Sequence, residues 1–124
     1  MTSETDLPYL YNAADVFILA AREVRPDVEG FGLVLLEASA CATPVVATRS
    51  GGVADAIVHG ETGCLVAQSS EALAGTLTAL LLDPAARRRM GLAGRAYVLR
   101  HATWRRVAER LLEAMSSESH EAVA

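Results

Sequence analysis

The stretch Leu33-Val-Leu-Leu-Glu-Ala-Ser-Ala-Cys-Ala-Thr-Pro-Val-Val-Ala47 decides the fold of this chain. Residues 33–42 are mostly apolar and helix-forming, which predicts a helix. The run Pro44–Ala47 that follows is short and apolar, which predicts a strand buried on both faces. A helix that leads directly into a buried strand is typical of α/β proteins.

Two more short apolar runs flank this unit. Asp15–Leu19 is rich in β-forming residues and predicts a buried strand before the helix, and Cys64–Val66 predicts a third strand. Glycine turns at Ser50–Gly52 and His59–Gly63 bound a short predicted helix over Val53–Val58. Strands that alternate with helices predict a parallel sheet with right-handed crossovers. The predicted fold class is therefore α/β, a partial Rossmann-like parallel sheet of about three strands with flanking helices. The missing strands are expected before residue 1.

The two ends of the chain are predicted to be helical. Asp6 is placed to cap a helix over Leu7–Ala13, and Asp83 followed by Pro84 marks the start of another helix. Residues 1–115 are predicted to form one domain and residues 116–124 a flexible tail. Inward-facing side chains are expected at Leu73, Leu77, Leu80, Leu81, Met90, Ala93 and Tyr97 and, in a last helix capped by Thr103, at Trp104, Val107 and Leu111.

Composition limits the classes of function. The 124 residues, 52% of them hydrophobic, suffice for one domain with a core. The net charge of −4 shows no basic excess, which argues against a nucleic-acid partner. The late arginines, from Arg87 to Arg110, are interpreted as a solvated face, with a membrane-surface patch as the alternative.

Several features predict a cytoplasmic location. Cys41 and Cys64 form no CxxC pair and are expected to be buried free thiols, as in a reducing compartment. The first residues lack the charged-then-apolar order of a signal peptide, and no apolar run reaches the ~18 residues of a membrane span. His59, His101 and His120 show no ligand spacing and are expected in surface or capping roles.

The chemistry is predicted at Glu29-Gly-Phe-Gly-Leu-Val-Leu-Leu-Glu37, where two glutamates flank the opening of a helix. A helix N-terminus offers unpaired N–H groups and a positive dipole end, and Gly30 and Gly32 let a ligand approach that backbone. The Glu37 carboxylate can accept two hydrogen bonds from a vicinal diol such as that of a ribose. From spacing alone, the alternative is that Glu29 is an exposed loop residue and that Glu37 lies on a solvated helix face. Against it, Glu37 lies among apolar residues, where a lone charge needs a partner.

Five motifs follow one another in a definite order. They are Tyr9-Leu-Tyr-Asn-Ala-Ala-Asp15, Glu29-Gly-Phe-Gly-Leu33, Glu37-Ala-Ser-Ala-Cys-Ala-Thr-Pro-Val-Val-Ala47, Gly51-Gly-Val-Ala-Asp-Ala-Ile57 and Gly60-Glu-Thr-Gly-Cys-Leu-Val66. Their order and spacing resemble the C-terminal, nucleotide-sugar-binding domain of family-4 glycosyltransferases, which have the GT-B fold. The resemblance extends from Leu7 to about Met115 and favours a functional role for both glutamates.

The resemblance implies a retaining transfer of a hexose from a nucleotide-diphosphate sugar to an acceptor hydroxyl. Glu29 would be catalytic and contact the donor hexose near its reacting centre. The backbone of Gly30, Phe31, Gly32 and Leu33 would meet the sugar hydroxyls and the β-phosphate, and Glu37 would hold the ribose hydroxyls. The family uses no DxD metal site, the sequence contains no DxD, and no metal or separate cofactor is expected.

The loop Arg22–Glu29 is similar to the longer loop of phosphatidylinositol mannosyltransferase-like members. It implies GDP-mannose or UDP-glucose as the donor, a lipid or glycan acceptor, and peripheral association with the inner face of the membrane. Two departures from the family lie elsewhere. Ala20-Ala21 replace a common Pro-Ser, and Ala42 and Thr43 precede Pro44 where a glycine is usual, which removes an easy left-handed helix cap.

A further departure concerns the leaving group. The family's arginine and lysine pair, which binds the diphosphate, lies upstream and has no match here, and the N-terminal acceptor domain has none either. Charge that develops on a leaving phosphate needs such stabilisation. The chain is therefore expected to be a truncated product, a split subunit or a piece of the enzyme, inactive alone. A non-catalytic nucleotide-sugar-binding module and a decayed fragment are the alternatives.

Ser50–Gly52 lines the nucleotide cleft or is simply a turn that needs positive φ, and both readings stay open.

Overall fold

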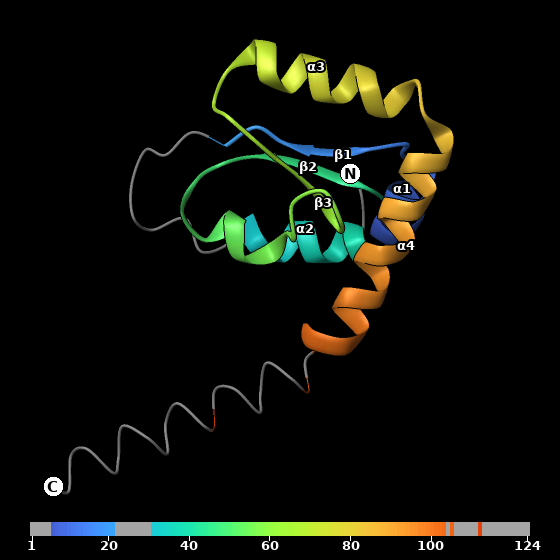
Figure 1. The fold of residues 1–124 in the computed structure, drawn as a ribbon. Helices are drawn as coiled ribbons and strands as arrows, with labels where there is room; N and C mark the ends of the chain where they lie inside the picture. The colour runs from blue at the N-terminus through green and yellow to red at the C-terminus, as the bar shows by residue number, and fades with distance from the viewer. Residues whose placement is uncertain (1–5, 22–30, 104, 106–111, 113–124) are drawn as a thin grey trace, which may run out of the picture.

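The computed structural model describes residues 6–21, 31–103, 105 and 112. Their elements, in chain order, are helix α1 (Leu7–Ala13), strand β1 (Phe17–Leu19), helix α2 (Phe31–Ala40), strand β2 (Val45–Thr48), 3-10 helix η1 (Gly51–Ala56), strand β3 (Gly63–Val66), and helices α3 (Ser70–Leu81) and α4 (Pro84–His101) (Figure 1).

The three strands form one parallel sheet in the order β1-β2-β3. Val45 pairs with Phe17 of β1 on one side and with Gly63 of β3 on the other. The layers are visible in Figure 1, where α2 and α3 cover opposite faces of the sheet. The predicted α/β class and the parallel pairing of the three strands are confirmed.

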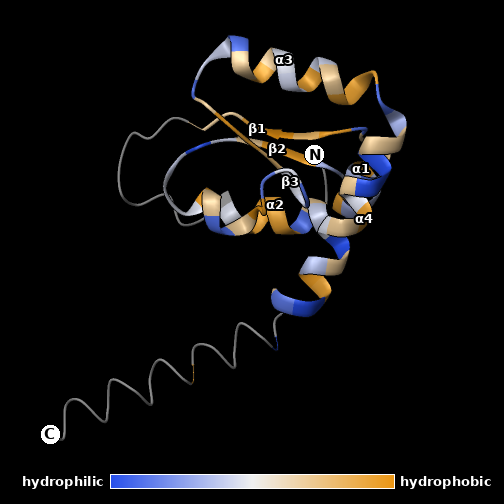
Figure 2. Cartoon of the chain, in the orientation of Figure 1, coloured by the Kyte–Doolittle hydropathy of each residue, from blue (hydrophilic) through white to orange (hydrophobic). Residues whose placement is uncertain are grey.

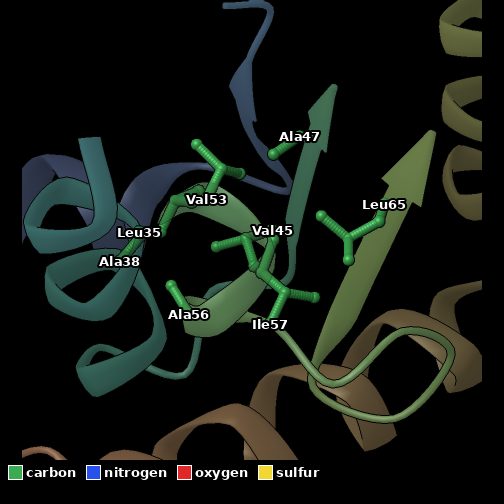
Figure 3. Packing of buried hydrophobic residues seen from close by; sticks show 8 residues of the cluster. All are labelled: Leu35, Ala38, Val45, Ala47, Val53, Ala56, Ile57 and Leu65. Atoms are coloured by element: carbon green, nitrogen blue, oxygen red, sulfur yellow. The ribbon is translucent and has the colours of Figure 1, made fainter. Parts of the chain in front are cut away.

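Strand β2 supplies the centre of both hydrophobic layers. Its four residues are buried, and successive side chains point to opposite faces. Val45 and Ala47 pack in one cluster between the sheet and α2, and Figure 3 shows this cluster with Leu35 at one side and Leu65 at the other. Val46 packs on the other face, against α3. The prediction of a strand buried on both faces is confirmed for this strand.

Strand β1 departs from the prediction. The sequence predicts a strand over Asp15–Leu19 that is buried on both faces, but the strand is limited to Phe17–Leu19 and Ile18 remains 42% exposed. β1 lies at the edge of the described sheet, so one side of it lacks a neighbouring strand. Full burial of a parallel strand needs neighbours on both sides as well as helices on both faces.

Other boundaries differ by a few residues. Residues 51–56 form a 3-10 helix in place of a helix over Val53–Val58, and α2 begins at Phe31, earlier than the sequence predicts. Asp6 precedes α1 as predicted but its side chain makes no capping hydrogen bond, because its backbone is already helical. Asp83 does cap α4, since its Oδ1 accepts a hydrogen bond of 3.0 Å from the N–H of Ala86.

The inward faces of α3 and α4 are only partly as predicted. Leu73, Leu77 and Leu80 pack against the sheet, whereas Leu81 is 53% exposed. In α4 the fully buried positions are Gly91, Gly94 and Val98, and the predicted Met90, Ala93 and Tyr97 are half-buried. Because Gly91 and Gly94 have no side chain, the α4 backbone packs closely against its neighbours at these positions. The glycines are therefore buried in place of the larger residues that the sequence predicts.

Gly91 and Arg95 fasten α4 to the end of α2. A Cβ atom at Gly91 would lie 2.1 Å from the carbonyl oxygen of Ala42. One turn later, Nη1 of Arg95 donates a hydrogen bond of 2.6 Å to the carbonyl of Ala40. Arg87 likewise caps α3, with bonds of 2.7 Å to the carbonyls of Leu80 and Leu81. Two of the late arginines therefore satisfy helix C-termini, which the interpretation as a solvated face did not include.

Ala42 adopts a left-handed backbone conformation, at the position where glycine is usual in the family that the sequence resembles. Its φ is +59°, and its N–H donates to the carbonyl of Ser39 at 2.9 Å. The N–H of Thr43 donates to the carbonyl of Ala38 at 3.1 Å, which completes a Schellman cap. The left-handed cap is thus kept without its glycine, although a left-handed non-glycine residue costs roughly 1–2 kcal/mol. α2 ends at Ala40, earlier than the predicted Ala42.

His59 lies at the surface, as predicted, and its Nδ1 accepts a hydrogen bond of 2.9 Å from the N–H of Leu65 in β3. Cys41 and Cys64 are free thiols, half-buried rather than fully buried. Across the described residues, no helix combines the length and the hydropathy that crossing a membrane requires. The contacts predicted for Trp104, Val107 and Leu111, His120 and the tail over 116–124 lie outside the described residues.

Candidate functional site

Helix α2 carries the described part of the predicted site. Because it connects the carboxyl end of β1 to the amino end of β2, its first turn lies at the carboxyl edge of the sheet. Phe31 opens the helix, Gly32 and Leu33 follow in the first turn, and Glu37 lies in the second. Glu29 and Gly30 lie outside the described residues, as does the Phe31 side chain. The structure therefore brings Gly32, Leu33 and Glu37 onto one helix and leaves the predicted catalytic glutamate untested.

Glu37 occupies the exposed face of α2. Its helix neighbours Leu35 and Ala38 are completely buried against the sheet, whereas the Glu37 side chain is exposed. The carboxylate also has a partner, because its Oε2 accepts a hydrogen bond of 3.0 Å from the hydroxyl of Tyr11. Leu35 and Ala38 thus belong to the opposite face of the helix, and the charge of Glu37 stays in contact with solvent.

Tyr11 positions the Glu37 carboxylate from helix α1. Its ring packs edge-on against Phe17, with centroids 5.5 Å apart, and its carbonyl accepts a hydrogen bond of 2.6 Å from the Thr43 hydroxyl. Burial, followed by the hydrogen bond to Glu37 and the charge of Glu37, raises the pKa of Tyr11 to about 12. The phenol is therefore protonated at neutral pH and acts as a donor to the carboxylate.

A hollow of about 350 Å³ opens beside Glu37, between α2 and the end of α4. Of the described residues that line it, most are apolar and Glu37 alone carries a carboxylate. Apolar walls with one well-placed polar group are typical of small-molecule sites. The lining residues are Leu33, Leu36, Glu37, Ala40, Val98, Ala102 and Thr103.

Gly32 leaves room at the start of α2. Among the described residues, a Cβ atom built on it would meet nothing closer than the Cβ of Ala56, at 4.0 Å, which is an ordinary contact. At Gly63, by contrast, the same atom would lie 2.6 Å from a methyl of Val45. Packing against the described residues therefore requires glycine at 63 but not at 32, and none of their side chains covers the bare backbone of Gly32.

A second hollow, also of about 350 Å³, lies at the carboxyl ends of the strands, and the sequence analysis missed it. Two of its polar side chains form hydrogen bonds to backbone carbonyls beyond the strand ends. The Thr48 hydroxyl donates to the carbonyl of Ala21 at 2.5 Å, and Gln68 donates to the carbonyl of Arg49 at 2.6 Å. Ligands of α/β sheets bind at this edge. Polar residues placed directly after buried strands were the signal that would have located it. The lining residues are Ala20, Ala21, Thr48, Gln68, Ser69, Ser70 and Leu73.

The turn at Ser50–Gly52 lies next to this edge. Gly51 has a φ of +34°, so the reading of a turn that needs positive φ is correct. The Ser50 hydroxyl is buried and has no hydrogen-bond partner among the described residues. A role in lining the nucleotide cleft stays a prediction. Within residues 6–21, 31–103, 105 and 112, no group of three or more His, Cys, Asp or Glu side chains is arranged to hold a metal ion.

Comparison with known proteins gives a family. The family described as "Glycosyl transferases group 1" matches residues 1–97. A GDP-mannose-dependent alpha-(1-6)-phosphatidylinositol monomannoside mannosyltransferase of Mycolicibacterium smegmatis is 42% identical over 114 residues, which cover 90% of this chain and 30% of the relative. The chain thus spans about three tenths of the length of that curated relative.

Solved structures agree with this match. Sucrose-phosphate synthase from Thermosynechococcus elongatus superimposes with a TM-score of 0.74 at 35% identity, over 93% of this chain and 27% of the synthase. HepE from Anabaena, solved in complex with UDP and glucose, has a TM-score of 0.76 at 27% identity, over 92% of this chain and 30% of HepE. With the fold, the motif order and the family match in agreement, the chain belongs to the group 1 glycosyltransferases, which have the GT-B fold.

Proposed function

We propose that this chain is the donor-binding part of a retaining glycosyltransferase that transfers a hexose from a nucleotide-diphosphate sugar to an acceptor hydroxyl. In this proposal Glu37 holds the ribose diol and the backbone of Gly30 to Leu33 meets the sugar and the β-phosphate. Glu29 is the catalytic residue that contacts the hexose. The Mycolicibacterium relative, named for a GDP-mannose donor, and HepE, solved with UDP and glucose, support a nucleotide-sugar donor.

The observation that carries the proposal is the open backbone of Gly32. Residues in the first turn of a helix have N–H groups without an intrahelical acceptor, and the helix dipole adds positive potential there. No described side chain lies within ordinary contact distance of the space that a Cβ at Gly32 would occupy, apart from Ala56 at 4.0 Å. A diphosphate can therefore approach this backbone closely, as at other helix N-termini.

A Gly32→Ala substitution separates this role from folding. Alanine is a better helix former than glycine by roughly 1 kcal/mol, so the variant is expected to be as stable as the wild type or slightly more stable. Its methyl group would occupy the space through which the diphosphate approaches. We expect at least tenfold weaker binding of GDP-mannose or UDP-glucose, a loss of about 1.4 kcal/mol. Isothermal titration calorimetry measures the affinity and urea unfolding the stability.

Gly75→Ala is the matched control for this experiment. Gly75 is exposed in the middle of α3, and a Cβ there would meet nothing within 4 Å. It carries the same chemical change in a helix that forms no part of the proposed donor site. Unchanged donor affinity in Gly32→Ala, equal to that of Gly75→Ala, would rule out the close approach of a ligand at Gly32.

The isolated 124 residues are expected to transfer no sugar to generic acceptors. The chain contains no lysine, and none of its arginines matches the upstream basic pair that the family resemblance implies. A leaving diphosphate would then be stabilised only by the N-terminus of α2. The assay is release of GDP or UDP from GDP-mannose or UDP-glucose by the purified chain. Turnover that is lost in Glu29→Ala would show that the missing pair is not essential.

The acceptor class and the location also belong to the proposal. The name of the Mycolicibacterium relative supports a lipid-linked acceptor, and the glycan acceptor stays the alternative. A cytoplasmic location, at the inner face of the membrane for a lipid acceptor, stays a prediction. The non-catalytic binding module would share the Gly32 effect on affinity but would show no turnover even when joined to an acceptor domain.

A further inference from the structure

We propose that the hollow at the carboxyl ends of the strands, beneath the start of α3, binds a neutral sugar ring of the acceptor. The inference rests on the proposed function for the place of this ring in the reaction. The hollow has a volume of about 350 Å³, within the range of roughly 300–1,000 Å³ that is typical of small-molecule sites. It would give the donor-binding part of the enzyme a subsite of its own, in addition to the separate acceptor domain that the resemblance implies.

The hollow opens at the same edge of the sheet as the proposed donor site. Ala20 and Ala21 follow the end of β1, and Thr48 is the last residue of β2. The first turn of α2 also lies at this carboxyl edge, but α2 and α3 cover opposite faces of the sheet (Figure 1). A sugar ring beneath α3 would therefore lie across the sheet edge from the space beside Gly32.

The described residues that line the hollow carry no charged side chain. A phosphate or a carboxylate would need a charged partner there, because removing an unpaired charge from water is costly. Sugar hydroxyls need only neutral donors and acceptors, which the polar part of the lining supplies. The chemistry of the lining thus favours a sugar ring over a diphosphate or another anionic group. The polar lining residues are Thr48, Gln68, Ser69 and Ser70.

Two of these side chains have hydrogen-bonding groups to spare. Gln68 uses one amide N–H on the carbonyl of Arg49, at 2.6 Å, so its amide oxygen and its second N–H can bind a ligand. Ser69 Oγ accepts the N–H of Ala72 at 3.1 Å and keeps its own O–H as a donor. Both side chains are exposed, and these bonds hold them in place. A sugar hydroxyl donates and accepts, so it can bond to either of them.

An apolar surface lies beside these polar groups. Leu73 packs against the cluster around Val46, and Ala20 and Ala21 add methyl groups from the end of β1. A sugar ring carries C–H groups on its faces and hydroxyls at its rim, so it needs both kinds of surface. Figure 2 shows the two kinds meeting here, where hydrophobic strands lead to hydrophilic residues at the start of α3.

The test is a titration of the 124-residue chain with methyl α-D-mannopyranoside, followed by the NMR shifts of the backbone amides. We expect saturable shifts at Gln68 and Ser70, with a Kd on the order of 1 mM for so small a ligand. Gln68→Met keeps the length of the side chain without its amide and should weaken binding about three- to tenfold. Thr78→Val is the matched control, because it removes a hydroxyl from α3 about two turns beyond the hollow. It should leave the affinity unchanged.

GDP and GDP-mannose distinguish an acceptor ring from the hexose of the donor. We expect the mannoside to bind equally well with or without either nucleotide at saturation, and neither nucleotide to shift the amides around the hollow. Displacement of the mannoside by GDP-mannose but not by GDP would assign the hollow to the donor hexose and overturn the inference.

The proposed function can fail separately from this inference. If GDP and UDP shift no amide near Gly32, the donor site is wrong, whereas the mannoside titration still decides whether the hollow binds sugar. The inference is overturned by the absence of a saturable shift at the hollow, by shifts confined to Gly32 and Leu33, or by an equal loss in Thr78→Val. Shifts at the hollow on addition of inorganic phosphate would overturn it as well. Circular dichroism verifies that each variant keeps its fold.

Discussion

Replacing Glu37 with alanine is expected to weaken the binding of GDP and UDP by about ten- to a hundredfold. Hydrogen bonds from a neutral diol to a carboxylate are each worth roughly 1.5–3 kcal/mol, and water replaces part of the loss of two such bonds. Since 1.4 kcal/mol corresponds to a factor of ten, the net loss falls in this range. Glu37→Gln keeps the shape without the charge and should lose only part of the affinity. Isothermal titration of each nucleotide against wild type and both variants measures the effect.

Two controls separate binding from structure. A 2′,3′-dideoxy nucleotide lacks the diol, so it should bind wild type and Glu37→Ala almost equally. Tyr11→Phe removes the 3.0 Å hydrogen bond to Glu37 but keeps the carboxylate. It should lower the stability by about 1 kcal/mol and leave nucleotide affinity within a few-fold of wild type. If Glu37→Ala and Tyr11→Phe lower the stability alike and neither changes the affinity, Glu37 is a structural partner of Tyr11 and nothing more.

Gly91→Ala should destabilise the chain by at least about 3 kcal/mol. Its methyl group would lie 2.1 Å from the carbonyl oxygen of Ala42, and that oxygen belongs to backbone that the cap of α2 holds in place. Forcing atoms into a packed site usually costs about 1–3 kcal/mol, and a clash with backbone lies at the upper end or beyond. Neither α4 nor the end of α2 can move away without losing the bond from Arg95 to Ala40. Urea unfolding monitored by circular dichroism gives the difference.

The sign of this change is diagnostic, because Gly→Ala in a helix is normally stabilising. Gly75→Ala in α3 should stabilise the chain by about 1 kcal/mol, since nothing lies within 4 Å of the added atom. The two variants are thus expected to shift the urea midpoint in opposite directions. A stabilised Gly91→Ala would mean that α4 does not approach α2 as closely as the structure has it.

Local chemistry made several elements predictable. The β-branched pair Val45 and Val46 needs burial on both faces, which only a central strand provides, and β2 is that strand. Asp83 and Pro84 form a start signal that depends on the backbone of a single turn, and α4 begins there. The order of the five motifs likewise identified the family. The predictions of β2 and α4 held because each depends on residues close together in the sequence.

The site could be predicted only in part. The sequence named Gly32 and Glu37, but it could not show that Tyr11 donates to Glu37, because the two residues are 26 positions apart. Their contact depends on how α1 lies against α2. The polar residues at the strand ends were missed for the same reason, since Thr48 and Gln68 line one hollow only once β2 and β3 lie side by side.

By itself, the sequence determined the α/β class, the three parallel strands and the start of α4, since periodicity, turn residues and capping signals act over a few residues. The order of its motifs also determined the family. The tertiary structure alone decided the exposure of Ile18, the left-handed Ala42 and the buried line of glycines in α4. Each of these depends on which element packs against which. A residue's local preference sets what it can form, but its neighbours across the fold set which side is buried and how closely two backbones approach.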